Sequence, residues 1–332
     1  MAPNATSTVA GTHVTEHSIT VDASAETLYG LVADVSAWPQ IFGPTIHVEV
    51  LEDVPGDGAG EQLLRIWATA NDQVKSWTSR RTLDRAARTV VFRQVVSAAP
   101  VASMGGEWRI EPVEDGGSRV VLLHDYRAVG DDPEALALIE RAVDRNSHAE
   151  LTALKNAAEQ GAERDELHFT FSDSVDIAGS AEDVFGFLDR ADLWPERLPH
   201  VARLDLTEAP AEDGSTVQRM DMDTSGPDGS THNTTSVRVC FPDRAVIVYK
   251  QLRVPVAMSG HTGRWEIETH GDGVRATSWH TVTLDPEGVL NALGPDTTLA
   301  EARAKVRHAL GTNSSTTLRH AKQFTEAPHA RP

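Results

Sequence analysis

The first half of the chain is dominated by short stretches in which apolar and polar residues alternate. Residues 14–22 show this period of two, which is typical of a strand with one buried face. Turn sequences such as PGDGAGE and EDGGS separate later stretches of the same kind. Further strands are predicted at about 45–53, 61–70, 73–83, 88–97, 100–112 and 118–129. The pattern therefore predicts a run of antiparallel strands.

Segments with helical periodicity interrupt or follow these strands. Ser24 is a suitable N-cap for a first helix, whose apolar stripe is Leu28, Leu31 and Val32. The sequence Ser36-Ala37-Trp38-Pro39 is expected to break it before a second short helix. Asp131-Asp132-Pro133 is expected to cap a long helix that runs to about residue 160. Its apolar positions recur at helical spacing: Leu136, Ile139, Val143, Leu151 and Leu154.

The same order of elements occurs twice. HSITVDASAETLYGLVADVSAWPQ, from His17, aligns with DSVDIAGSAEDVFGFLDRADLWPE, from Asp173, at a constant offset. The alignment continues to the end of the chain and pairs Phe92 with Tyr249, Trp108 with Trp265, His124 with His280, and Asn146 with Asn313. We therefore predict two domains, residues 13–161 and 168–326, a linker at 162–167, and disordered ends at 1–12 and 327–332.

These elements predict an α+β fold. A long helix must bury its apolar stripe, and in each copy a strongly bent sheet is the large surface available for it. We expect two tandem helix-grip domains, in each of which a curved antiparallel sheet wraps around the long C-terminal helix and leaves an internal cavity.

The strand QVKSWTSRRTLD carries the first candidate site. Its even face is hydrophilic from Ser76 to Thr82, so the odd face, which holds Trp77, Ser79, Arg81 and Leu83, is expected to point inward. A buried guanidinium needs a carboxylate partner or a solvated cavity. The alternative is a strand-end arginine that snorkels or pairs structurally.

Two further features place polar groups on inward faces. Asn146-Ser147 interrupts the stripe of the long helix, and Asn313-Ser314 does so in the second copy. Such residues either line a wet cavity or satisfy nearby backbone. His124 lies in a predicted strand beside Leu122 and Tyr126, as a structural histidine or as a group poised for proton transfer.

Composition limits the function. The formal net charge of −19 argues against sequence-independent nucleic-acid binding. No apolar run is long enough for a membrane span, and the N-terminus lacks the pattern of a secretory signal. Cys240 is the one cysteine, which fits a reducing cytoplasm. Neither metal-ligand spacing nor a hydrolase or nucleotide motif is found, so no metal and no cofactor are expected.

The motifs AWPQ, SWTSRR and ASMGGEW, in this order and followed by the closing helix, resemble the di-domain aromatase/cyclases of bacterial type II polyketide synthases. These proteins belong to the START-like helix-grip superfamily. The resemblance covers about residues 13–160 and 168–326. The motifs are fairly specific as an ordered and duplicated set, although AWP alone is weak.

The resemblance implies a substrate and partners. The substrate would be a linear poly-β-ketone, reduced at one ketone, held as a thioester on an acyl carrier protein. The enzyme would promote aldol closure of the first ring, between carbons seven and twelve, and its dehydration to an aromatic ring. A ketoreductase and a minimal synthase would be further partners, and neither nucleic acid nor a membrane is implied. Arginines Arg80, Arg85 and Arg88 are our candidates for a basic surface that docks the acidic carrier.

The resemblance also assigns residues. Arg81 matches the pocket arginine, Ser79 its hydrogen-bonding serine, and His124 a polar pocket position, so these three are the catalytic candidates. The predicted substrate-binding residues are Trp38, Trp77, Met104, Trp108, Tyr126 and Asn146. The predicted residues of a second pocket are Trp194, Ser236, Arg238, Trp265, His280 and Asn313.

The second copy departs from the pattern. Arg238 shares a face with Thr234, which replaces Trp77, while the apolar residues Val237 and Val239 occupy the opposite face. That face is the wrong one for an inward arginine, so either the strand register differs or the face packs against the other domain. His261 replaces Met104 and makes the second cavity more polar. We therefore expect the main chemistry in the N-terminal pocket.

Two other functions stay open. The same grip could carry an apolar small molecule without reaction, with Arg81 anchoring an acidic head group. Alternatively, the chain could be a scaffolding pseudo-enzyme. Substitution of Arg81 by alanine distinguishes a scaffold from an enzyme, because a scaffold would keep its effect without this side chain.

Overall fold

The computed structural model describes residues 11–327 except 57, 71–72, 98, 115, 162–165, 212 and 226–230. The chain divides between residues 161 and 162 into two compact units. Most of the predicted linker and of the two predicted disordered ends lies outside the described residues. Each unit contains a seven-stranded antiparallel sheet with helices, so the predicted fold class of two tandem α+β domains is confirmed.

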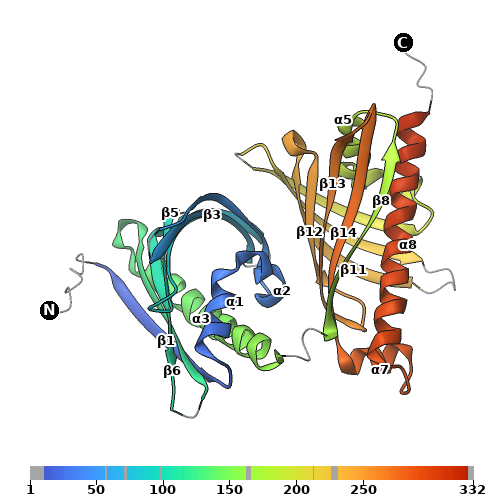
Figure 1. Cartoon of the computed structure of the whole chain (residues 1–332). Coiled ribbons are helices and arrows are strands. Elements are labelled where there is room, and N and C mark those ends of the chain that lie inside the picture. The colour runs from blue at the N-terminus through green and yellow to red at the C-terminus, as the bar shows by residue number, and fades with distance from the viewer. Residues whose placement is uncertain are drawn as a thin grey trace. The chain divides into compact units, whose positions relative to one another are not determined.

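The N-terminal sheet has the strand order β1-β7-β6-β5-β4-β3-β2. Consecutive strands from β2 to β7 are neighbours, and β1 closes the order beside β7, so every pairing is antiparallel. Figure 1 shows the sheet curling around its helices. The strands are β1 His13–Val21, β2 Thr45–Val54, β3 Ala59–Ala70, β4 Gln73–Asp84, β5 Thr89–Val96, β6 Val101–Pro112 and β7 Ser118–Ala128.

The first helices of this unit follow local capping chemistry. Helix α1, Ala25–Ala33, begins at Ser24, whose hydroxyl accepts the backbone N–H of Thr27 at 3.1 Å. A 3-10 turn, Val35–Ala37, separates it from helix α2, Trp38–Ile41. The first helix therefore ends before Pro39 and a second short helix follows, as predicted; Pro39 itself lies in the first turn of α2, where a proline is tolerated.

The long helix α3, Pro133–Glu159, covers one part of the sheet. Asp132 caps it by accepting the backbone N–H of Glu134 at 3.2 Å. Its buried stripe is Ile139, Val143, Ser147, Leu151, Leu154 and Ala158, and it packs against β1 and β7. The predicted stripe is therefore present, and Ser147 is one of its members.

The C-terminal unit repeats this order with one addition. Its sheet has the order β8-β14-β13-β12-β11-β10-β9, and a helix α7, Pro286–Leu293, precedes the closing helix α8, Leu299–Glu326. The short helices are α5, Ala181–Asp189, and α6, Trp194–Arg197. The strands are β8 His168–Ile177, β9 Val201–Pro210, β10 Thr216–Ser225, β11 Thr231–Phe241, β12 Val246–Arg253, β13 Met258–His270 and β14 Gly273–Leu284.

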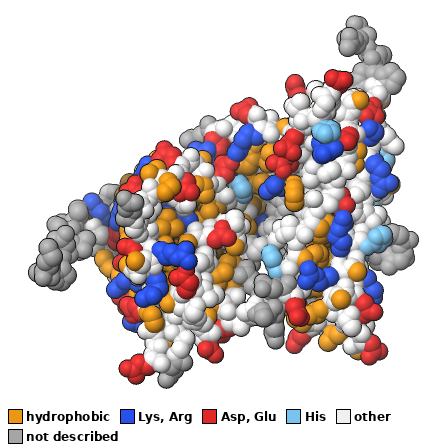
Figure 2. Space-filling model, viewed as in Figure 1, with side chains coloured by type: hydrophobic (Ala, Val, Ile, Leu, Met, Phe, Trp, Pro, Cys, Tyr) orange, Lys and Arg blue, Asp and Glu red, His pale blue; other side chains and the backbone are white. Residues whose placement is uncertain are grey.

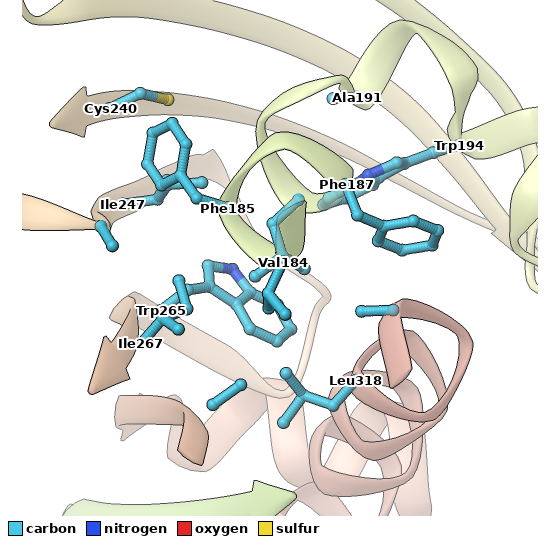
Figure 3. Close-up of a cluster of buried hydrophobic side chains, with 14 of the residues drawn as sticks. Val184, Phe185, Phe187, Ala191, Trp194, Cys240, Ile247, Trp265, Ile267 and Leu318 are labelled. Atoms are coloured by element: carbon cyan, nitrogen blue, oxygen red, sulfur yellow. The ribbon is translucent and has the colours of Figure 1, made fainter. Parts of the chain in front are cut away.

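One end of the C-terminal unit is a packed apolar core. Side chains from α5, the sheet and α8 meet there, as Figure 3 shows for Phe185, Phe187, Trp265 and Leu318. These side chains fill the space between the sheet and the helices at this end of the unit. Open space lies further along the same sheet, as described below.

Strand β11 does not follow the period-two expectation. Arg238 is 2% exposed, yet Val237 and Val239 on the opposite face are fully buried as well. Arg238 pairs with Gln218 of β10, as Arg81 pairs with Gln62 of β3, so the strand register is the same in both units. The apolar face was therefore a misleading guide to the inward face, because both faces of β11 are buried.

Candidate functional site

The guanidinium of Arg81 binds the end of helix α1. Its Nη1 donates to the carbonyl oxygen of Val32 at 3.1 Å and its Nη2 to that of Ala33 at 2.5 Å. Nε and Nη2 both donate to Gln62 Oε1, at 2.9 and 2.5 Å. The group also lies 5.6 Å from the centre of the Trp38 ring. Arg81 thus donates hydrogen bonds to carbonyl oxygens that the C-terminus of a helix leaves unpaired.

The sequence left a carboxylate partner, a solvated cavity and a structural pairing open for Arg81, and these contacts are a structural pairing. Arg81 is 2% exposed, and its partners are an amide oxygen and helix carbonyls in place of a carboxylate. Burial lowers the pKa of Arg81 to about 10, so the group stays charged at neutral pH. The four hydrogen bonds leave one of the five N–H groups of the guanidinium without a described partner.

The other predicted residues of the N-terminal unit occupy different environments. Ser79 is buried and donates to the carbonyl oxygen of Arg93 at 3.2 Å. Trp108 is buried and lies near Phe42, while Trp77 and Met104 are half-buried. Tyr126 is fully buried in a cluster with Ala128, Ile139 and Val143 and so forms part of the packed core.

His124 lies on the inner face of β7 against helix α3. Its Nδ1 is 3.3 Å from the hydroxyl of Ser147, and its ring packs edge-on against Phe92 at 5.6 Å. Burial lowers the pKa of His124 to about 4, so the imidazole is neutral at neutral pH. Asn146, which was predicted on the inward stripe of the long helix as a substrate-binding residue, is exposed. The pair that meets here is therefore His124 and Ser147.

Glu150 was missed by the sequence analysis. It lies one helical turn beyond Ser147 and one before Leu154, both of which are buried, so it shares the inner side of α3. Burial without an offsetting charge raises the pKa of Glu150 to about 7. A carboxyl group with this pKa can both donate and accept a proton near neutral pH. The helical spacing of Glu150 from the buried residues Ser147 and Leu154 was the signal in the sequence that could have identified it.

The arginine arrangement of the N-terminal unit is repeated in the C-terminal unit. Arg238 donates through Nε to Gln218 Oε1 at 2.8 Å, and through Nη1 and Nη2 to the carbonyl oxygens of Leu188 and Asp189, both at 2.9 Å. It lies 5.1 Å from the centre of the Trp194 ring. The same hydrogen bonds to a glutamine and to the last helix carbonyls therefore hold the end of α5, so Arg81 and Arg238 share a structural role.

The C-terminal unit encloses a cavity of about 670 Å³. This volume lies within the range of small-molecule sites, which is about 300–1,000 Å³. Its walls come from β10–β14 and from helices α6, α7 and α8. The lining includes all the residues predicted for the second pocket, namely Trp194, Ser236, Arg238, Trp265, His280 and Asn313. Their catalytic or binding roles stay predictions.

Three aromatic residues on the cavity wall form one hydrogen-bonded cluster. Tyr249 Oη lies 2.9 Å from His280 Nδ1, and His261 Nε2 lies 3.0 Å from the same nitrogen. Ser278 Oγ is 3.1 Å from His280 Nε2. Burial lowers the pKa of His280 to about 4 and holds the pKa of His261 well below its usual value. Burial raises the pKa of Tyr249.

The N-terminal unit lacks this cluster because two of its positions differ. Phe92 stands in place of Tyr249, and Met104 in place of His261. His261 was recognised from the sequence as a polar replacement, whereas the hydroxyl that Tyr249 adds at the position aligned with Phe92 was not. The internal alignment already contained this signal, whereas the hydrogen bonds among the three side chains required the fold.

Three residues with metal-binding chemistry meet outside these sites. His17 Nε2 lies 3.0 Å from Asp144 Oδ1, and His148 Nδ1 lies 3.6 Å from the same oxygen. The sequence analysis found no metal-ligand spacing, because His17 comes from β1 and the other two from α3. Asp144 and His148 are largely exposed.

Comparison with known proteins identifies the family. Residues 12–159 and 168–314 each match the family model described as "Polyketide cyclase / dehydrase and lipid transport". The chain belongs to this family. Two tandem copies of the family domain therefore make up nearly the whole sequence.

Relatives share the complete two-domain architecture. The chain is 46% identical to the granaticin polyketide synthase bifunctional cyclase/dehydratase of Streptomyces violaceoruber, over 95% of this chain and 94% of that protein. It is also 46% identical to the actinorhodin polyketide synthase bifunctional cyclase/dehydratase of Streptomyces coelicolor, over 94% and 96%.

Solved structures agree. The di-domain ARO/CYC BexL, from the BE-7585A biosynthetic pathway, has a TM-score of 0.84 at 49% identity and covers 96% of this chain and 100% of its own. The di-domain ARO/CYC StfQ, from the steffimycin biosynthetic pathway, has a TM-score of 0.81 at 35% identity and covers 94% and 98%. The described helices include none that is both long and apolar enough to cross a bilayer.

Proposed function

We propose that this protein is a polyketide aromatase/cyclase that closes and dehydrates the first ring of a poly-β-ketone. The observation that carries the proposal is a cavity of about 670 Å³ with apolar walls on which a guanidinium, a phenol and two imidazoles converge. Such a chain can close many rings, so catalysis depends on holding two particular carbons at attack distance. Full-length relatives bear the name bifunctional cyclase/dehydratase, which supports the assignment.

We assign ring closure to the N-terminal unit on the family resemblance, since the cavity of about 670 Å³ belongs to the C-terminal unit. A methylene carbon between two carbonyls loses a proton to a base, the resulting enolate carbon bonds to a ketone carbon, and the ketone oxygen then takes up a proton. His124 and Glu150 are the groups on the inner side of this unit that can exchange protons. The free N–H of Arg81 is suited to polarise the attacked carbonyl, and Ser79 holds the strand beside it.

The proposed substrate is carried by an acyl carrier protein and reduced at one ketone, with closure between carbons seven and twelve. A ketoreductase and a minimal synthase would supply it. Aldol closure and dehydration are redox-neutral, so the proposal requires no cofactor. This part of the proposal rests on the family resemblance and on the polyketide synthase names of the relatives.

A carrier-docking surface would need basic side chains that acidic neighbours do not offset. Figure 2 shows acidic and basic side chains intermingled on the visible face. Arg80 lies 3.5 Å from Glu52 and 3.9 Å from Glu61, and Arg85 pairs with Glu26. Glutamates therefore already offset two of the three arginines proposed for docking, and Arg88 is the remaining candidate.

The test is reconstitution with a minimal synthase, a ketoreductase and a carrier protein. We expect the purified protein to shift the products from spontaneously closed rings to one aromatic product. Chromatography with mass detection measures this shift. An unchanged product pattern, together with tight binding of an apolar ligand, would instead favour a carrier of small molecules.

A further inference from the structure

The C-terminal cavity is lined by a hydrogen-bonded cluster of one tyrosine and two histidines that the described residues of the N-terminal unit lack. Tyr249, His261 and His280 all line the cavity, and the two histidines are 3% and 4% exposed. Their rings stack, with centres 5.3 Å apart and planes 19° apart. Gly263 makes room for the tyrosine, since a Cβ at this position would lie 2.4 Å from Tyr249 Oη. Gly106 leaves the same room for Phe92 in the N-terminal unit, so this glycine is common to both units and the hydroxyl is the difference.

Tyr249 Oη also lies 3.4 Å from His261 Nε2. We assign an arrangement that leaves every buried N–H of the two histidines with an acceptor. In it, the Tyr249 hydroxyl and the His261 Nε2–H both donate to His280 Nδ1, while His280 Nε2–H donates to Ser278 Oγ. His261 Nδ1 then carries a lone pair, and this buried atom has no hydrogen-bond partner among the described residues.

This arrangement presents an acid and a base to the same cavity. The phenol of Tyr249 is a proton donor, because burial raises its pKa and keeps it protonated. The imidazole of His261 is a proton acceptor, because burial and the neighbouring His280 hold its pKa well below the usual value and keep it neutral. A neutral acid beside a neutral base is what the elimination of water from a β-hydroxy ketone requires.

We propose that the C-terminal cavity is a second active site, in which Tyr249 and His261 dehydrate the cyclic β-hydroxy ketone formed by ring closure. The inference rests on the proposed function and deepens it, because it places the two reactions in different units. The substrate class is a carrier-bound ketol, whose hydroxyl lies on the carbon next to the one that bears the acidic hydrogen.

The step balances in atoms and electrons. His261 Nδ1 takes the hydrogen from the α-carbon, the electrons of that C–H bond form the C=C bond, and the C–O bond breaks. Tyr249 donates its proton to the departing hydroxyl, which leaves as water. His261 passes its Nε2 proton to His280 Nδ1, which returns one to the tyrosinate across the 2.9 Å contact. The site ends neutral, with His261 in its other tautomer, and exchange with solvent restores it.

The N-terminal unit supplies the substitutions for a test. Tyr249→Phe and His261→Met install the side chains that Phe92 and Met104 already place at the aligned positions. Tyr249→Phe removes one oxygen and keeps the ring, and His261→Met keeps a long side chain in the space, so both are suited to preserve the fold. Thr281→Ala is the matched control, because Thr281 follows His280 in β14 and bonds to Thr170 on the opposite face.

The experiment uses the full chain in the reconstituted synthase, with melting temperatures for every variant. We expect Tyr249→Phe and His261→Met each to lower the rate of dehydration by about 100-fold, so that a cyclised product heavier by one water accumulates. Thr281→Ala should behave as the wild type. Wild-type dehydration by both folded variants would overturn the second active site and leave the proposed function intact. A wild-type protein without effect on the products would overturn both.

Discussion

At the scale of single residues, the buried arginines matter most. Arg81 and Arg238 each bind the last carbonyls of a helix, a glutamine and a tryptophan ring in the same way. A motif comparison indicates a catalytic guanidinium, and the geometry shows that the same group caps a helix and keeps one N–H without a described partner. Loss of activity after substitution of Arg81 would therefore combine two effects, the loss of a catalytic group and a loss of stability.

We predict that Arg81→Met destabilises the protein by about 3 kcal/mol, because it leaves Gln62 and the carbonyls of Val32 and Ala33 without their donor. Arg80→Gln on the exposed side of the same strand is the matched control and should change the stability by less than about 0.5 kcal/mol. Urea unfolding measures both. Equal stability of the two variants would contradict the capping role.

Glu150 predicts a pH dependence of stability. Its carboxyl pKa is about 7 in the folded chain, against an ordinary value of 4.5. The unfolded chain therefore releases the proton more readily, and the folded state loses stability as the pH rises from about 4.5 to 7. We expect Glu150→Gln to match the wild type at pH 4 and to be more stable by about 1 kcal/mol at pH 8. Parallel unfolding curves at both values of pH would show that the group is solvated.

At the scale of elements, the sequence was most informative where one face of a strand or helix is buried. The seven strands of the first unit, the capped helix α1 and the stripe of α3 follow directly from periodicity and capping residues. The prediction failed at β11, where both faces are buried. Period-two patterns carry no information about the inward face once both faces are apolar or buried.

Two glycines test how the elements are built. Gly263 in β13 has no space for a side chain, because a Cβ would lie 2.2 Å from the carbonyl oxygen of Trp279. We expect Gly263→Ala to lower the stability by about 2 kcal/mol. Gly186 in α5 has nothing within 4 Å of its virtual Cβ, so Gly186→Ala should raise the stability by about 0.5–1 kcal/mol through helix propensity. Thermal unfolding separates the two. Shifts of the same sign would contradict this account of the close strand approach.

At the scale of the whole molecule, the duplication allows two similar domains to differ in chemistry. The aligned positions Phe92 and Tyr249, and Met104 and His261, show where the copies diverged. The repeat, the fold and the family were accessible from sequence because they depend on pattern and order. The hydrogen-bonded cluster and the inward position of Glu150 were not, since they depend on which side chains from distant strands and helices meet.

The measurement that tests the account most directly is the intact mass of the carrier protein during a single turnover. The account predicts that the wild-type protein converts the carrier-bound linear chain into a species lighter by water while the thioester persists. A carrier-bound chain of unchanged mass, or one released before any water is lost, would contradict ring closure and dehydration on the carrier.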